Sequence, residues 1–158
     1  MELSTYRCRA CQTPLHHVLV DLGETPLANS YLPHLGTADS EPRHPLTAYV
    51  CDQCWLVQVP TMQSSEAIFS DYAYFSSFSS SWVDHCQRYA RQMVDSLELN
   101  ALSQVIEIAS NDGASLRPFH ERGVAVLGIE PAQNIARHAN ALGIPTRPLF
   151  FGAHTSQQ

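Results

Sequence analysis

The chain has 158 residues, enough for one ordinary domain or two small ones. Its formal net charge is −6 with only nine Lys and Arg residues, which weighs against a protein that binds the phosphate backbone of nucleic acids. No apolar run approaches the ~18 residues of a membrane span, and Met1–Tyr6 has no signal-peptide pattern. We therefore expect a cytoplasmic protein with reduced thiols and with no nucleic-acid or membrane partner.

Four of the five cysteines come as two C-x-x-C pairs, Cys8 with Cys11 and Cys51 with Cys54. In a reducing compartment, such pairs indicate a metal site and not disulfides. Four thiolates fit a tetrahedral zinc site that has no open position, which is typical of structural and not catalytic zinc. The sequence therefore predicts structural Zn²⁺ held by all four cysteines.

The cysteine pairs belong to a segment, residues 1–60, that has few helix signals and many prolines. Such a segment has too little core to be stable alone, and a bound metal would supply the missing stability. We predict a small β-rich zinc-binding module that ends near Pro60. Its β-like runs lie at His17–Leu22, Thr47–Val50 and Trp55–Val59.

Aromatic residues and serines are interleaved in the next segment, which runs from residue 61 to Ser81. This segment is either a surface loop with its aromatics packed against the next domain or a binding loop that lines a polar ligand site. A helix follows from about Ser81 to Asn100, with Ser80 or Ser81 as its cap. Cys86 lies on the apolar face of this helix, where a buried structural thiol is expected.

A nucleotide-binding half-unit is predicted after this helix. A buried strand at Val105–Ala109 leads through a tight turn into a helix at Ala114–Arg122. A second strand, Val124–Ile129, then ends at Glu130. Two apolar strands with a helix between them and an acid about 20 residues past the turn are typical of a half-unit that binds a ribose.

The first of these strands has no polar alternation beyond Glu107, as expected of a strand covered on both faces. A helix at Gln133–Leu142 and a possible third strand at Arg147–Phe151 continue the pattern. The predicted fold class is therefore α/β, with the zinc-binding module followed, over residues 61–158, by the N-terminal part of a Rossmann-like domain.

The turn after the first strand is not a G-x-G-x-x-G fingerprint, because Gly113 is its only glycine. Small polar side chains in the turn suit a ligand without a pyrophosphate, such as S-adenosylmethionine (SAM). Glu107 would face the methionine end of SAM, and Glu130 would accept hydrogen bonds from the ribose hydroxyls. The predicted cofactor-binding residues are Glu107, Ala109, Ser110, Asn111, Asp112, Gly113, Glu130 and Pro131.

Several motifs resemble those of one family in the same order along the chain. They are Cys8-x-x-Cys11, residues 26–32 (PLANSYL), 50–58 (VCDQCWLVQ), 74–82 (YFSSFSSSW), 107–113 (EIASNDG) and 128–132 (GIEPA). Together they are similar to the N-terminal part of the SAM-dependent sugar C-methyltransferases. Members of that family add a methyl group to a carbon of a nucleotide-linked keto-deoxysugar.

This resemblance implies a four-cysteine zinc module followed by a class I methyltransferase domain that binds SAM, with the aromatic-serine loop at the active site. It makes Tyr74 the candidate loop residue that touches substrate or cofactor. Family members continue for more than twice this length, so we expect the chain to be a truncated product or fragment. C-methylation needs a base that removes the proton alpha to the keto group, and no residue here matches the base of the family.

The same topology predicts an exposed edge. In the methyltransferase fold the first strand is central, and later strands pair on its other side. We therefore expect the edge of Val105–Ala109 to be unpaired, which favours self-association through that edge.

Two other functions remain as alternatives. One is a zinc-ribbon-like binding module with a partial α/β appendage and no catalysis, which leaves the pair Glu107 and Glu130 unexplained. The other is a dinucleotide-dependent oxidoreductase, which the missing glycines of the turn weaken.

Overall fold

The computed structural model describes residues 6–32, 34 and 41–157. The chain divides into two units, residues 1–64 and 65–158. We call them the metal module and the cavity unit, and we describe each by itself. Most of Met1–Tyr6, on which the expectation about a signal peptide depends, lies outside the described residues. No helix among the described residues is long and apolar enough to cross a membrane.

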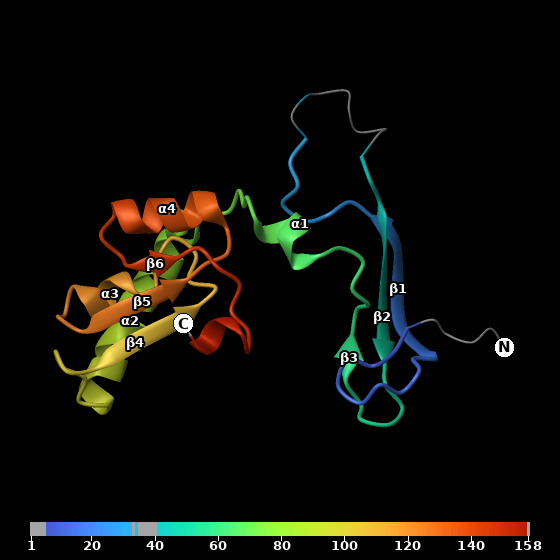
Figure 1. Ribbon diagram of the computed structural model, residues 1–158, viewed down its shortest axis with the longest axis horizontal. Coiled ribbons are helices and arrows are strands. Elements are labelled where there is room, and N and C mark those ends of the chain that lie inside the picture. Colours follow the sequence, from blue (N-terminus) through green and yellow to red (C-terminus); the bar gives the residue numbers. More distant parts are fainter. Residues whose placement is uncertain (1–5, 33, 35–40, 158) are drawn as a thin grey trace. The chain divides into compact units, whose positions relative to one another are not determined.

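The metal module contains a three-stranded antiparallel sheet in the order β1-β2-β3 (Figure 1). Its strands are β1 His17–Thr25, β2 His44–Val50 and β3 Val57–Gln58. The first two confirm the β-like runs predicted there and extend beyond them. The third is shorter than predicted, because Trp55 has a φ of 63° and belongs to a turn.

The core of the metal module is small, as its sequence predicted. Cys8, Leu15 and Cys51 are buried together, with Tyr6, Tyr49 and Leu56 packed against them in part. Since two of the three buried residues are cysteines, most of the module's core is also its candidate metal site.

The cavity unit has a parallel sheet in the order β4-β5-β6 (Figure 1). Its strands are β4 Gln104–Ile108, β5 Ala125–Ile129 and β6 Thr146–Arg147. The third strand was predicted to run from Arg147 to Phe151, which is wrong. Pro148 has no backbone N–H with which to continue the ladder, and the strand ends before it.

The helices of the cavity unit begin with the short α1, Ser65–Phe69, and the 3-10 turn η2, Ser76–Phe78. The long helix α2, Ser80–Ser96, starts one residue before its predicted start and ends four residues before its predicted end. Its cap is Ser79 and not the predicted Ser80 or Ser81, because Ser79 Oγ accepts a hydrogen bond from the backbone N–H of Trp82 at 3.3 Å.

Two further helices follow the strands. Helix α3 covers only Arg117–His120, whereas Ala114–Arg122 was predicted to be helical. Pro118 lies in the first turn of α3 and residues 114–116 form turns, so the helix starts late. Helix α4, Gln133–Ala141, agrees with its prediction to within one residue. A last 3-10 turn, η3, covers Thr155–Gln157.

The core of the cavity unit lies on one face of the sheet. It joins residues of α2, α3 and α4 with Val105 of β4 and Val126 of β5. The side chains of Ile106 and Ile108 point to the opposite face of β4, and they are 55% and 54% exposed. The prediction that this strand is covered on both faces is therefore wrong for the described residues. Helices α2, α3 and α4 pack on the face that carries Val105, and the face that carries Ile106 and Ile108 is exposed.

Strand β4 lies at one edge of its sheet. It pairs with β5 in parallel, from Gln104 opposite Ala125 to Ile108 opposite Ile129. Within the described part of the chain, no strand pairs with its other edge. This agrees with the unpaired edge that the family's topology predicted.

Candidate functional site

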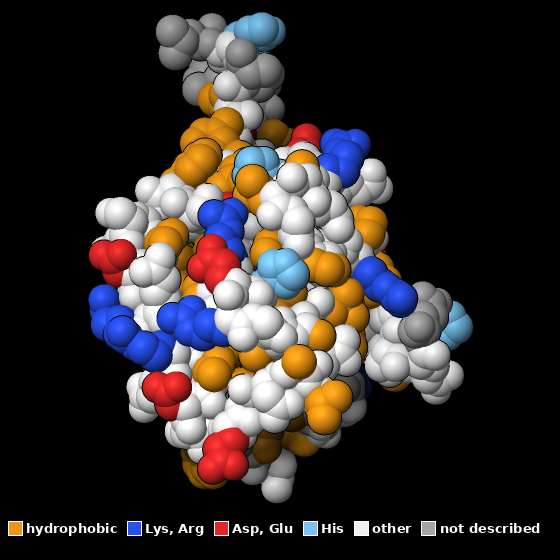
Figure 2. Space-filling view, turned by 90° about the vertical axis from the view of Figure 1, so that its left-hand side faces the viewer, with side chains coloured by type: hydrophobic (Ala, Val, Ile, Leu, Met, Phe, Trp, Pro, Cys, Tyr) orange, Lys and Arg blue, Asp and Glu red, His pale blue; other side chains and the backbone are white. Residues whose placement is uncertain are grey.

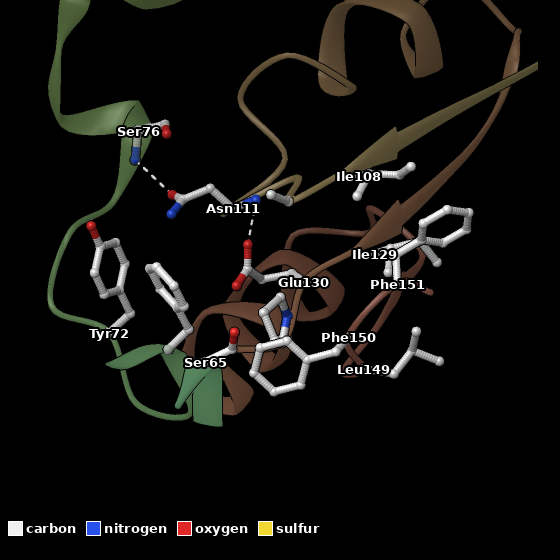
Figure 3. A pocket seen from close by; sticks show the side chains of 13 residues that line it. Ser65, Tyr72, Ser76, Ile108, Asn111, Ile129, Glu130, Leu149, Phe150 and Phe151 are labelled. Carbon is white, nitrogen blue, oxygen red and sulfur yellow. Dashed lines mark hydrogen bonds between the residues drawn. The ribbon is translucent and has the colours of Figure 1, made fainter. Parts of the chain in front are cut away.

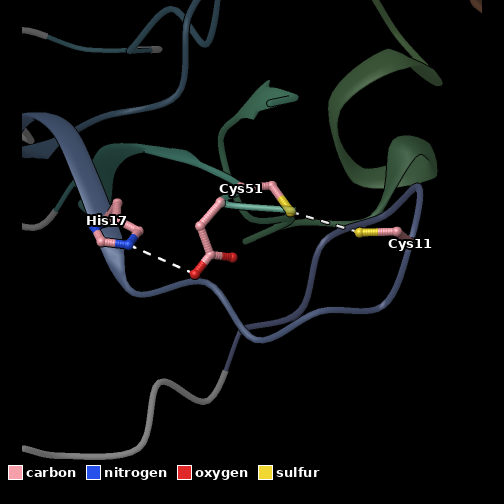
Figure 4. Close-up of polar contacts among 4 residues, drawn as sticks. Cys11, His17 and Cys51 are labelled. Atoms are coloured by element: carbon pink, nitrogen blue, oxygen red, sulfur yellow. Dashed lines mark hydrogen bonds and ion pairs between the residues drawn. The ribbon is translucent and has the colours of Figure 1, made fainter. Parts of the chain in front are cut away.

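The four cysteines of the two C-x-x-C pairs meet at one point of the metal module. Their Sγ atoms all lie within 4.8 Å of one another. The Cys8–Cys54 and Cys11–Cys51 pairs are both 3.5 Å apart, and the latter is drawn in Figure 4. A tetrahedral zinc with Zn–S bonds of 2.3 Å has S–S edges of about 3.8 Å. The four thiols therefore fit a closed zinc site.

Each cysteine pair is presented by a turn of the same geometry. The backbone N–H of Gln12 donates to the carbonyl of Cys8 at 2.9 Å, and that of Trp55 donates to the carbonyl of Cys51 at 3.0 Å. Both Gln12 and Trp55 have a φ of 63°. These two similar turns point the sulfurs of both pairs toward the same place, as expected of two zinc knuckles.

The surroundings of the sulfurs favour thiolates in the first pair. A backbone N–H at Cys11, followed by the side-chain amide of Gln58, lowers the pKa of Cys8 to about 6. Hydrogen bonding with Thr13 lowers the pKa of Cys11. For Cys54 a backbone N–H at Leu56 lowers the pKa, but contact with the Cys8 thiol, burial and the other thiols raise it to about 12. Since thiolates and not thiols bind metals, the contacts of the first pair favour metal binding there.

Two ionisable side chains outside the cysteine set lie close by. His17 Nε2 lies 3.6 Å from Asp52 Oδ2. Figure 4 draws this contact as the dashed line from His17. Both side chains are about half exposed, so this pair adds little stability. It belongs to the surface of the module and not to the metal site.

The fifth cysteine plays no part in the metal site. Cys86 is 2% exposed on α2, as predicted for a structural thiol. Burial, followed by the charge of Glu107, raises the pKa of its thiol. Cys86 is therefore a packed thiol and not a nucleophile.

The cavity unit contains a cavity of about 420 Å³ at the carboxyl ends of β4 and β5 (Figure 3). Open α/β folds bind ligands at this end of their strands. Most of its lining is apolar, and Glu130, Asn111 and several hydroxyl groups supply the polar atoms. The lining residues are Ser65, Phe69, Tyr72, Ser76, Ile108, Ala109, Asn111, Ile129, Glu130, Pro131, Leu149, Phe150 and Phe151.

Glu130 is the only acidic residue that lines this cavity in the described part of the chain. Its Oε2 accepts from the backbone N–H of Asn111 at 2.9 Å, a bond drawn in Figure 3. Its Oε1 accepts from the backbone N–H of Ala132, also at 2.9 Å. These two bonds hold the carboxylate in one orientation. Each oxygen keeps a second lone pair, with which the carboxylate can accept hydrogen bonds from a ligand.

Asn111 fastens the aromatic-serine loop to the turn after β4. Its Oδ1 accepts from the backbone N–H of Ser76 at 2.8 Å, and its Nδ2 donates to the carbonyl of Tyr74 at 3.1 Å. Asp112, which is fully buried, accepts from the backbone N–H of Ser77 at 3.1 Å. The side chains of the turn therefore hold the loop beside the cavity.

The predicted cofactor residues separate into two groups. Ala109, Asn111, Glu130 and Pro131 line the cavity, whereas Glu107, Ser110, Asp112 and Gly113 do not. Of the two loop tyrosines, Tyr72 lines the cavity and Tyr74, the predicted contact with substrate or cofactor, does not.

Three oxygen atoms of the second group are buried without a hydrogen-bond partner among the described residues. They belong to Glu107 (Oε2), Ser110 (Oγ) and Asp112 (Oδ1). Burial is the main reason why the pKa of Glu107 rises to about 7; a hydrogen bond with Ser115 opposes the rise and the charge of Asp112 adds to it. Glu107 therefore carries a proton much more often than an exposed glutamate.

The structure brings several residues to these sites that were not expected from the sequence. Phe69, Leu149, Phe150 and Phe151 line the cavity. The apolar run after β6 was a visible signal, but it indicated a strand. Gln58 contacts Cys8 in the metal site, and nothing in the spacing of the cysteines pointed to it.

Comparisons with known proteins support the metal site and relate most of the chain to a C-methyltransferase. Residues 8–69 match a family model described as "Putative zinc binding domain". The chain is 32% identical, over 151 residues, to the C-methyltransferase NovU of Streptomyces niveus. The chain is related to the N-terminal part of a C-methyltransferase. The match covers 96% of this chain and 36% of the relative, so the chain spans about a third of that protein's length.

This relationship confirms the resemblance that the motifs indicated. It covers both the metal module and the cavity unit, because 96% of the chain is aligned. Together with the cysteine cluster, the family match supports zinc as the metal of residues 8–54.

Proposed function

We propose that this chain forms the zinc module and the cofactor site of a SAM-dependent C-methyltransferase that acts on a nucleotide-linked keto-deoxysugar. The observation that carries the proposal is the cavity at the ends of β4 and β5, with the oriented carboxylate of Glu130 in its wall. The relationship to a C-methyltransferase supports the same function.

The residues of the cavity fit SAM by their chemistry. Glu130 would accept hydrogen bonds from the ribose hydroxyls, as acids at the end of the second strand do in nucleotide-binding folds. Ile108, Ile129 and Phe150 offer apolar surface to the adenine. When bound, SAM supplies an electrophilic methyl group. The protein's part at this site is to bind and orient the cofactor and to exclude water from it.

A base that removes the proton alpha to the keto group is also required. In the described cavity lining, Glu130 and Tyr72 are the ionisable residues, and Glu130 is engaged by two backbone N–H groups. The neutral hydroxyl of a tyrosine is a weak proton acceptor, so we assign the base to a residue outside this cavity lining. The zinc has a structural role in this proposal, because its four cysteine ligands leave no open position.

The test is calorimetric titration of SAM into the zinc-loaded chain and its Glu130→Gln variant. We expect saturable binding to the wild type and at least about tenfold weaker binding to the variant, a loss of about 1.4 kcal/mol. Glu121→Gln, an acid-to-amide change at an exposed position, is the matched control and should bind like the wild type.

Two outcomes would contradict the proposal. One is the absence of SAM binding by a folded, zinc-loaded chain. The other is tight binding of NAD⁺ in place of SAM, which would favour a dinucleotide-dependent oxidoreductase. Circular dichroism of each variant shows whether a loss of binding comes from a loss of fold.

We also propose that the open edge of β4 lets two copies of the chain associate. No described strand pairs with this edge, and Ile106, an apolar residue of β4, is 55% exposed. Light scattering should show an average molar mass that rises with protein concentration. The Ile106→Lys variant should have a lower molar mass at the same concentration. Leu102→Lys, at a 98% exposed position before the strand, is the control. A monomer at all concentrations would contradict the association.

A further inference from the structure

Gln58 is a buried polar residue in the metal module. It lies in β3, paired with Tyr49 of β2, and only 8% of it is exposed. Glutamine is mostly found at protein surfaces, and a buried amide is stable only when its donors and acceptor have partners. The partners of Gln58 therefore show why it is buried here.

Both ends of the Gln58 amide contact the first cysteine pair. Its Oε1 accepts from the backbone N–H of Arg9 at 3.0 Å, and its Nε2 donates to Cys8 Sγ at 3.2 Å. A backbone N–H can only donate, so the amide oxygen must face Arg9 and the amide nitrogen must face the sulfur. The orientation of the amide follows from its partners and is not arbitrary.

A second contact holds Arg9 in the same place. Its Nη2 donates to the carbonyl of Val59 at 2.6 Å. The segment that follows the second cysteine pair is thereby bonded to the first pair through Gln58 and Val59. These bonds join two parts of the chain that are about 50 residues apart in sequence.

The charge of the metal site gives the Gln58 contact its importance. Four thiolates around Zn²⁺ carry a net charge of about −2. Cys8 is fully buried, so water does not solvate its share of that charge. An N–H donor that points at the sulfur stabilises it, and partners of metal ligands typically change metal affinity by about 10–100-fold when they are replaced.

We propose that Gln58 is a positioning residue of the metal site, which donates a hydrogen bond to the Cys8 thiolate and locks the first cysteine pair to the second so that zinc is retained. This role rests on the assignment of zinc to the four cysteines. It concerns a residue that contacts a ligand of the metal and not the metal itself.

The test replaces Gln58 in the full chain and measures zinc affinity by competition with a chromogenic chelator. Gln58→Met keeps the length of the side chain and removes the donor, and we expect zinc affinity to fall by about 10–100-fold. Gln58→Glu places a carboxylate against the thiolate and should weaken binding further. Gln53, an exposed glutamine between Cys51 and Cys54, offers matched controls in Gln53→Met and Gln53→Glu, which should bind zinc like the wild type.

A spectroscopic readout separates a hydrogen bond from a general packing role. In the Co²⁺-loaded protein, loss of a donor to a thiolate makes that sulfur more electron-rich. We therefore expect the sulfur-to-cobalt charge-transfer band to move to lower energy in Gln58→Met and to stay in place in Gln53→Met. The band is read only from protein that holds cobalt, so it remains informative if the variant folds less well.

Two results would overturn the proposal. One is a zinc affinity of Gln58→Met and Gln58→Glu equal to that of the wild type. The other is weaker binding with an unchanged cobalt band, which would make Gln58 a packing residue with no effect on the thiolate.

Discussion

The two units of this chain place their candidate sites differently with respect to their cores. In the metal module, Cys8 and Cys51 are both site and core, with Leu15 as their buried neighbour. In the cavity unit, the core lies under the sheet around Leu116 and Val126, while the cavity lies at the strand ends. Metal binding and folding are therefore one equilibrium in the first unit, whereas the second has a scaffold that is separate from its site.

Removal of one metal ligand tests this difference most severely. Structural zinc contributes on the order of 10–16 kcal/mol to the folding of zinc-finger peptides. Cys51→Ser should therefore abolish zinc binding and unfold the metal module, while the cavity unit stays folded. Zinc content and hydrogen exchange of each unit measure the two effects.

Cys86→Ser is the matched control for this change, because Cys86 is a buried cysteine outside the metal site. It should leave the zinc content unchanged. Retention of zinc by Cys51→Ser, or loss of protection in both units together, would contradict the separation of the two sites.

Gly128→Ala should have the next largest effect, and it should fall on the cavity unit alone. A Cβ at Gly128 would collide with Ser110 Oγ and lie 2.8 Å from Thr146 Oγ1. Overpacking of this kind costs about 1–3 kcal/mol of unfolding free energy, which urea denaturation would measure. Gly152→Ala, where no atom lies within 4 Å, should be neutral.

A second change sharpens the prediction for Gly128. Ser110→Gly removes the nearest obstacle, so it should restore part of the stability lost in Gly128→Ala. A Gly128→Ala variant as stable as the wild type would contradict the close packing of β5 against the turn after β4.

Asn111→Ala should loosen the aromatic-serine loop without unfolding its unit. The change removes the side-chain bonds to Ser76 and Tyr74, each worth about 0.5–1.5 kcal/mol. Faster hydrogen exchange at residues 74–78 is the expected result. Asn100→Ala, which also removes local side-chain bonds, should not affect that loop. Unchanged exchange in Asn111→Ala would contradict the role of this turn in holding the loop.

Glu107→Gln should have an effect on stability that depends on pH. Since the pKa of Glu107 is raised to about 7 in the folded state, folding favours its protonated form. Its contribution to stability is complete below the unfolded pKa of about 4.3 and is lost as the pH rises through about 7. The variant should therefore gain stability relative to the wild type between about pH 5 and pH 8.

Urea denaturation of both proteins at the two pH values measures this gain. The exposed Glu121→Gln should show a difference from the wild type that does not change with pH. A pH-independent difference for Glu107→Gln would mean that its carboxyl group is solvated in the folded protein.

The metal site could be predicted almost completely from the sequence, because the spacing of Cys8, Cys11, Cys51 and Cys54 encodes the ligand set directly. Gln58 could not, since its contact with Cys8 depends on the register of β3 against β2. Local chemistry of this kind is visible in a sequence only when the residues that make it are close together.

The cavity unit was predictable in its outline and not in its details. The strands, the turn and Glu130 follow from the hydrophobic pattern, which reports burial. The engagement of Asn111 and Asp112 with the loop does not follow, because small polar side chains suit both a ligand and a backbone N–H. The pattern of β4 also suggested cover on both faces, whereas Ile106 and Ile108 are exposed in the structure.

The most direct test of the account is an NMR titration of the zinc-loaded, ¹⁵N-labelled chain with SAM. The account predicts changes in the backbone amide signals of Ala109, Asn111 and Glu130, and none at the four zinc-binding cysteines. Changes at the cysteines with none at the ends of β4 and β5 would contradict the division of this chain into a structural metal module and a cofactor-binding unit.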